Sequence, residues 1–98
     1  MKKLNSIEKV RKQIDLIDSD ILDLIVKRHA LVIEAVKLKR RDQIIDKTRI
    51  KKIIRSLKEV AKKKGLPPYL VETVWMEMIN GFIKFEEESF DEIHNNKN

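Results

Sequence analysis

The sequence contains no cysteine, so disulfide bonds, zinc–thiolate sites and thiol nucleophiles are excluded. Neither histidine supports metal binding or nucleophilic chemistry, because His29 has no second ligand at metal spacing and His94 lies in the expected C-terminal tail. No long hydrophobic run occurs, and the basic start is followed by alternating charge, which predicts neither a signal peptide nor a membrane-spanning helix. We therefore expect a cytoplasmic protein without a metal site or a membrane partner.

Aromatic residues are also scarce, at 5%, although the net charge is +6. Clustered lysine and arginine side chains can bind nucleic acid by neutralising its phosphates. Much of the positive excess, however, lies in residues 51–64, with few aromatic side chains in the chain to stack on bases. We therefore favour a solvated basic helix face over a nucleic-acid site.

Glycine and proline occur only twice each, and three of these four residues mark one boundary. In the stretch KKKGLPPYL, Gly65 is suited to stopping a helix in the left-handed conformation, and Pro67 and Pro68 are suited to opening the next one. Upstream, Asp46 can cap another helix by accepting backbone N–H bonds. These signals predict three helices, over residues 6–41, 47–64 and 68–92, with residues 94–98 frayed.

Apolar residues recur at steps of three and four within each expected helix, which is the spacing of a packed seam. No strand pattern competes and no internal repeat occurs, so we predict an all-α fold and a single domain over residues 1–98. The expected seam comprises Ile7, Val10, Ile14, Ile17, Ile21, Leu24, Leu31, Ala35 and Leu38, then Ile50, Ile53, Ile54, Leu57, Val60 and Ala61, then Val71, Val74, Trp75, Met78, Phe82, Phe85 and Ser89.

The first expected helix is too long for one copy of the chain to cover. At about 1.5 Å rise per residue it reaches roughly 54 Å, whereas a compact chain of this size has a radius of gyration of about 13 Å. We therefore expect an intertwined homodimer in which the long helices pack against each other. A monomeric bundle with a bent first helix is the alternative, although no glycine or proline interrupts residues 6–41.

Several charged residues fall inside the apolar stripes. Arg28 and Lys39 lie nearly in line on the first helix, about three turns or roughly 16 Å apart. Arg11 lies at the edge of the same stripe, and Glu86 lies within the stripe of the third helix. A buried charge needs a partner, and an ion pair that fixes helix register would be sufficient for any one of these residues alone.

Taken together, the inward charges do not balance. The cations are Arg11, Arg28, Lys39 and Arg49, and the anions that offset them are Glu86 and Asp46. A bound dianion would restore the balance. The pattern therefore predicts an apolar-walled pocket between helices for a small molecule that carries more than one carboxylate.

In these residues the chain resembles the small all-helical (AroQ-class) chorismate mutases, a family that includes isochorismate pyruvate lyases. The resembling segments are VRKQIDLIDSDILDLIVKRHALVIEAVKLK in the first helix, DKTR as an Asp-x-x-Arg turn, and FIKFEEE in the third helix. Arg11, Arg28 and Lys39 fall on the family's cationic positions, Asp46 and Arg49 on its Asp-x-x-Arg, and Glu86 on its Gln/Glu position. The spacing of the three cations is the specific part of the match.

The resemblance implies an intertwined homodimer with two sites, each receiving Arg11 from the other chain. The implied reaction converts chorismate to prephenate, for aromatic amino acid biosynthesis, without a covalent intermediate or a cofactor. The protein would select a reactive conformation and stabilise charge on the breaking ether oxygen. Arg11, Arg28 and Arg49 would hold the carboxylates, and Lys39 and Glu86 would donate to the ether oxygen from opposite sides.

Glu86, Ile50 and Phe82 bear on the choice between a mutase and a lyase. Glu86 can donate a hydrogen bond only when protonated, so we expect activity to fall as the pH rises. Ile50 and Phe82 replace polar residues of many mutases, and the lyase branch is apolar or aromatic there. Cleavage of isochorismate to salicylate and pyruvate is therefore an alternative, as is a non-catalytic helical dimerisation module. Asp46 and Glu86 favour the mutase, and Asp46 and Phe82 complete the expected substrate-binding set.

Overall fold

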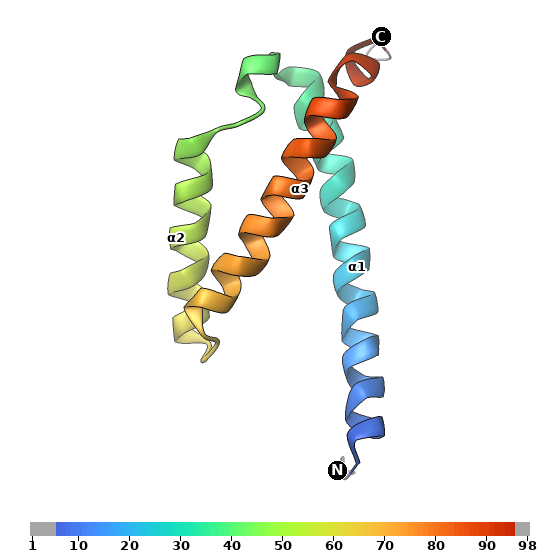
Figure 1. Cartoon of the computed structure of the whole chain (residues 1–98), viewed down its shortest axis with the longest axis vertical. Coiled ribbons are helices and arrows are strands. Elements are labelled where there is room, and N and C mark those ends of the chain that lie inside the picture. The colour runs from blue at the N-terminus through green and yellow to red at the C-terminus, as the bar shows by residue number, and fades with distance from the viewer. Residues whose placement is uncertain (1–5, 96–98) are drawn as a thin grey trace. The chain divides into compact units, whose positions relative to one another are not determined.

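The computed structural model describes residues 6–95, which form three α-helices and one 3-10 turn with no strand among them (Figure 1). The helices are α1 (Ile7–Leu38), α2 (Lys47–Lys63) and α3 (Pro68–Asn95), and the 3-10 turn η1 spans Arg41–Gln43. The all-α prediction is confirmed. Two boundaries differ from the expected ones, because α1 ends before residue 41 and α3 continues past residue 92.

Local sequence signals set the boundaries of α2 and the start of α3. Asp46 is the N-cap of α2, and its side chain accepts a hydrogen bond from the Arg49 N–H at 3.0 Å. Gly65 follows the helix with a φ of 79°, in the left-handed region, while the Leu66 N–H donates to the Ala61 carbonyl at 2.9 Å. Pro68 is the first residue of α3, where the missing N–H costs no helical bond. These predicted boundaries are confirmed.

The first helix ends earlier than expected because the following residues form a closed turn. The Arg40 N–H donates to the Gln43 side chain at 2.8 Å, and the Gln43 N–H donates to the Arg40 carbonyl at 2.9 Å. These bonds offer the backbone an alternative to the α-helical pattern. Ile44, which is 5% exposed, anchors the end of the turn although the expected seam omitted it. Lys39 therefore lies just beyond α1 rather than within it.

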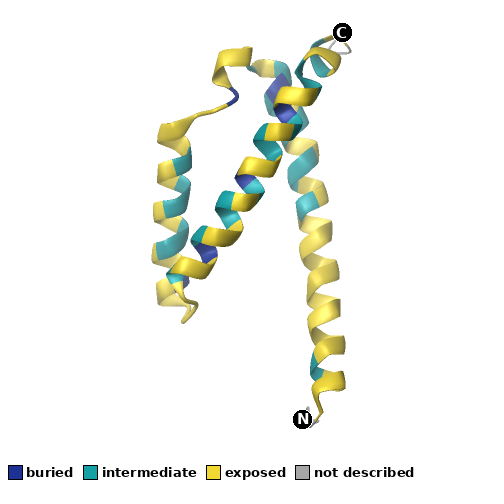
Figure 2. Cartoon of the chain, viewed as in Figure 1, coloured by how far each residue is buried: buried dark blue, intermediate teal, exposed yellow. Residues whose placement is uncertain are grey.

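The chain divides into two compact units, residues 1–31 and 32–98, and each is described by itself. In the second unit, the turn at Gly65 reverses the chain so that α3 runs alongside α2 (Figure 1). Glu86 is buried in the same unit. Its apolar core is formed by Val36, Ile44, Ala61, Val71 and Ile79 (Figure 2). The predicted seam lacks Val36, Ile44 and Ile79 of this core. It includes Leu38, Val60 and Val74, which are 83%, 46% and 50% exposed.

The described part of the first unit is helical from Ile7 to Leu31, and its apolar side chains are largely exposed in the single chain (Figure 2). The exposed ones run from 48% at Ile21 to 70% at Leu31, whereas Val10 and Ile25 are half-buried. A helix gains most of its stability in a protein by packing such a stripe against another element. None of the described helices is both long enough and apolar enough to cross a membrane.

Candidate functional site

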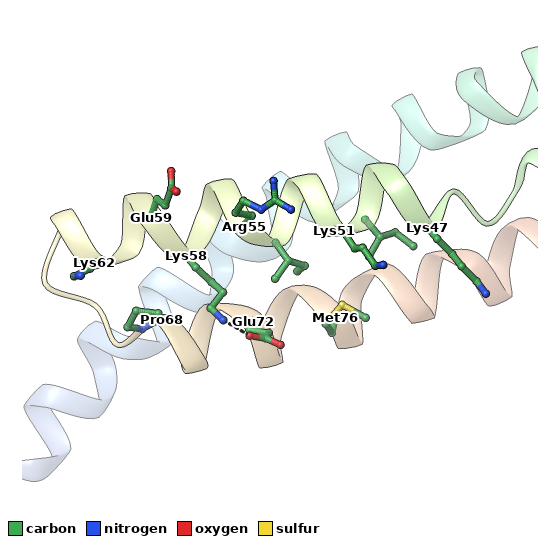
Figure 3. A pocket seen from close by; sticks show the side chains of 11 residues that line it. Lys47, Lys51, Arg55, Lys58, Glu59, Lys62, Pro68, Glu72 and Met76 are labelled. Carbon is green, nitrogen blue, oxygen red and sulfur yellow. Dashed lines mark hydrogen bonds and ion pairs between the residues drawn. The ribbon is translucent and has the colours of Figure 1, made fainter.

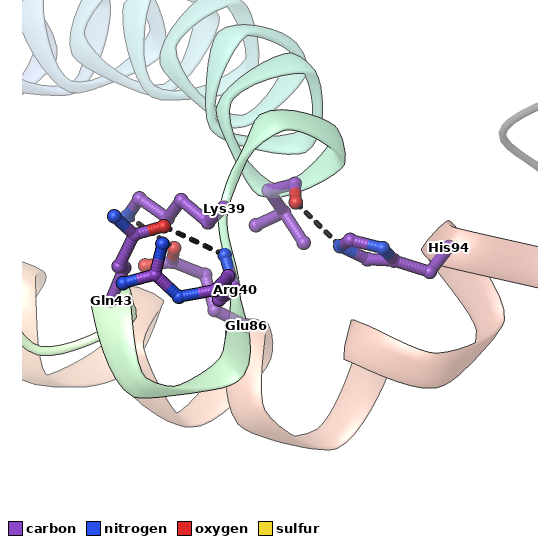
Figure 4. Close-up of polar contacts among 6 residues, drawn as sticks. Lys39, Arg40, Gln43, Glu86 and His94 are labelled. Atoms are coloured by element: carbon purple, nitrogen blue, oxygen red, sulfur yellow. Dashed lines mark hydrogen bonds and ion pairs between the residues drawn. The ribbon is translucent and has the colours of Figure 1, made fainter.

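A largely buried ion pair connects the end of α1 to α3. Lys39 Nζ donates to Glu86 Oε1 at 2.9 Å (Figure 4). Glu86 is only 5% exposed, whereas the side chain of Lys39 is 30% exposed. Removing a carboxylate from water costs several kcal/mol unless a counter-charge and hydrogen bonds replace the lost hydration. Lys39 therefore offsets the charge of Glu86, and part of its side chain stays open to solvent.

The backbone before Lys39 is fixed by two donors to one carbonyl. The Val36 carbonyl accepts from the Lys39 N–H at 3.1 Å and lies 2.8 Å from His94 Nε2 (Figure 4). A carbonyl can only accept, so the ring nitrogen of His94 donates in this contact. The expected fraying from residue 94 onward is thus wrong for His94 and Asn95, which belong to α3, while residues 96–98 lie outside the described residues.

The start of α2 presents Asp46 and Arg49, both exposed. Their contact is the capping bond, in which the Asp46 carboxylate accepts from the backbone of Arg49. The cap engages the backbone rather than the guanidinium of Arg49, so the local structure of the turn does not depend on that side chain. A guanidinium presented in this way can form a bidentate pair with a carboxylate ligand.

Two apolar residues stand at predicted polar positions, one before Glu86 in α3 and one in the first turn of α2. Phe82 precedes Glu86 by four residues, so the two share a face of α3, and Phe82 is half-buried. Ile50 is half-buried in the first turn of α2. At both positions the sequence departs from the expected mutase pattern, and the structure places apolar surface there.

The two remaining predicted cations belong to the first unit. Arg11 is exposed and Arg28 is half-buried, both on α1. The structure therefore brings Lys39 and Glu86 together and places Asp46 and Arg49 on one turn. A single site that also includes Arg11 and Arg28 remains a prediction.

A groove of about 800 Å³ lies between α2 and α3 (Figure 3). Ile50, Ile54 and Met76 contribute apolar surface to it, and Lys47, Lys51, Arg55, Lys58 and Lys62 contribute positive charge. The ammonium of Lys58 pairs with Glu72 across the groove at 2.6 Å. Lys39 and Glu86 do not line this groove, so it is a separate feature of the second unit.

The described residues contain no group of three or more histidine, aspartate or glutamate side chains placed to hold a metal ion. Comparison with known proteins gives one family: the chorismate mutase type II sequence pattern matches residues 10–87. The matched region begins near the start of α1 and ends just after Glu86, and thus includes every predicted site residue. No curated protein and no solved structure matches the chain.

Proposed function

The chain belongs to the chorismate mutase type II family, and from that premise we propose that it catalyses the rearrangement of chorismate to prephenate. The observation that supports this activity most directly is the pair of Lys39 and Glu86, 2.9 Å apart. We assign catalysis to Lys39, Glu86 and Arg28, and substrate binding to Arg11, Arg28, Lys39, Asp46, Arg49, Phe82 and Glu86.

The chemistry of this rearrangement explains why no nucleophile is required. One C–O bond of the substrate breaks and one C–C bond forms within the same molecule, so no atom is gained or lost. The protein can contribute by holding the reacting ends close together and by stabilising the negative charge that develops on the ether oxygen. A lysine whose side chain is partly open to solvent, as at Lys39, suits the second task.

The role of Glu86 requires a change from the arrangement without substrate. Glu86 accepts a hydrogen bond from Lys39 in the structure. To donate to the ether oxygen it must carry a proton, and Lys39 must turn one donor toward the substrate.

We also propose that the active form is a homodimer. The apolar face of α1 from Ile7 to Leu31 is largely exposed in the single chain, and a second copy would bury it. The basic groove between α2 and α3 is opposite in charge to the acidic residues Asp18 and Asp20, which flank the apolar stripe of α1. In this dimer Arg11 would reach the site of the other chain.

Cleavage of isochorismate to salicylate and pyruvate is the second candidate. Ile50 and Phe82 favour it, because both are apolar and half-buried where many mutases place polar residues. Glu86 and Asp46 favour the mutase. Under the mutase assignment the product would feed aromatic amino acid biosynthesis, and the absence of cysteine agrees with a cytoplasmic location.

One experiment separates these assignments. The protein is incubated with chorismate and, separately, with isochorismate, and the products are identified by chromatography. Prephenate from chorismate supports the mutase, whereas salicylate and pyruvate from isochorismate support the lyase. If neither substrate is consumed by a folded, dimeric protein, a non-catalytic dimerisation module is the better description.

A further inference from the structure

We propose that His94 is a positioning residue for Lys39: the last two turns of α3 clasp the chain on both sides of Lys39 and thereby hold its ammonium at Glu86. This inference rests on the proposed catalytic role of Lys39. Phe90, Asp91 and His94 lie beyond residue 87, outside the region matched by the family pattern. They are therefore a feature of this chain rather than part of the matched pattern.

One face of α3 carries the clasp. Glu86, Phe90 and His94 follow one another at four-residue intervals, which places them on the same face of the helix. Glu86 contacts Lys39, and His94 contacts the Val36 carbonyl three residues before it, at 2.8 Å. Glu86 and His94, eight residues apart on α3, thus contact Lys39 and Val36, which are three residues apart at the end of α1.

The His94 contact is made at a buried position. Val36 is 0% exposed, and its carbonyl belongs to the last turn of α1, where helical carbonyls lack intrahelical partners. Because the Lys39 N–H donates to the same oxygen, the position of that carbonyl directly sets where the backbone of Lys39 begins. A change at His94 is therefore transmitted to Lys39 through one shared atom.

A second contact holds the chain after Lys39. Arg41 pairs with Asp91 at 2.8 Å, and its guanidinium carbon lies 4.7 Å from the centre of the Phe90 ring. The Phe90 ring in turn stacks on His94, with centroids 4.0 Å apart. Asp91 is largely exposed, so its ion pair contributes little by itself. We therefore expect substitution of His94, which contacts the buried Val36, to displace Lys39 more than substitution of Asp91 would.

The expected consequence is a loss of turnover rather than of binding. A donor that must meet a developing charge loses effect when it is displaced by about 1 Å, and such displacements can lower a rate by up to about a hundredfold. Substrate affinity is assigned mainly to Arg11, Arg28 and Arg49, whereas the clasp holds the backbone next to Lys39. A weakened clasp should therefore lower kcat and leave KM nearly unchanged.

Two matched variants of the full chain test this. His94→Gln places an amide nitrogen near the position of Nε2, whereas His94→Asn carries the same amide one methylene short of the Val36 carbonyl. We expect kcat to fall about tenfold in His94→Asn and to remain within about twofold of wild type in His94→Gln, with KM shifted less than about twofold in both. Asn95→Gln, at the exposed neighbouring position, controls for the amide swap and should leave kcat unchanged.

A measurement that does not need turnover accompanies the kinetics. Hydrogen exchange of the Lys39 amide, which donates to Val36, should quicken in His94→Asn and not in His94→Gln or Asn95→Gln. Equal kcat values for His94→Asn and wild type would overturn the proposal, as would equal losses in the Asn and Gln variants. If wild-type protein converts neither substrate, the proposed function fails, and unchanged Lys39 exchange in His94→Asn would separately show that His94 does not hold Lys39. A His94→Asn variant that fails to fold would also overturn it, because the loss would then be one of structure rather than of positioning.

Discussion

The Lys39→Ala variant distinguishes two roles for Lys39, one in catalysis and one limited to neutralising the buried carboxylate of Glu86. The substitution removes the ammonium from which Glu86 accepts its 2.9 Å hydrogen bond. Breaking a fully buried ion pair by removing one partner costs about 3–5 kcal/mol, because the other charge is left uncompensated. Since the Lys39 side chain is 30% exposed, water can take up part of its role, and we expect a loss of about 2 kcal/mol in the free energy of unfolding.

The effect on rate has a different origin and a different size. Removing one preorganised donor to a developing negative charge lowers kcat by roughly a hundredfold to a thousandfold, or about 2.7–4 kcal/mol in the activation barrier. Adding Glu86→Gln to Lys39→Ala removes the uncompensated carboxylate. The double variant should therefore recover most of the lost stability, while its kcat should lie below that of Glu86→Gln by the same factor that separates Lys39→Ala from wild type.

The assay combines urea unfolding with turnover of chorismate for wild type, both single variants and the double variant, as a double-mutant cycle. The catalytic assignment would be refuted if Lys39→Ala were destabilised but kept its kcat. It would also be refuted if the double variant turned over chorismate as fast as Glu86→Gln, because Lys39 would then matter for structure alone.

Three further predictions concern other parts of the molecule. Glu86→Gln should keep at least the wild-type kcat for chorismate, because its amide N–H donates to the ether oxygen without an added proton; a kcat lowered by more than about tenfold would contradict the donor role of Glu86. Asp46→Ala should lower the free energy of unfolding by about 1 kcal/mol in urea titrations, because the N-cap of α2 is lost, whereas Asp46→Asn should retain most of it; equal losses would argue against the capping bond. Ile17→Asp, on the exposed apolar face of α1, should yield an inactive monomer in sedimentation experiments, and an active monomer would contradict a site shared between chains.

Helical periodicity predicted which residues of the candidate site face inward, but not which of them contact each other. Charged residues within apolar stripes singled out Lys39 and Glu86, because helical periodicity places a residue on a face without knowledge of its neighbours. The periodicity could not show that these two side chains bond to each other, since 47 residues separate them in the sequence. It also misplaced Lys39 inside the first helix, because the turn that ends α1 depends on a specific side-chain bond of Gln43.

The all-α class and the boundaries at Asp46, Gly65 and Pro68 were predictable from the sequence, because a capping oxygen, a positive φ and a missing N–H act within a few residues of the chain. The place of Ile44 in the core and the contact of His94 with Val36 were not. The latter joins residues 58 apart, and no local propensity distinguishes a histidine in a frayed tail from one that donates to a buried carbonyl. These contacts depend on packing between distant segments, which forms only when the helices come together.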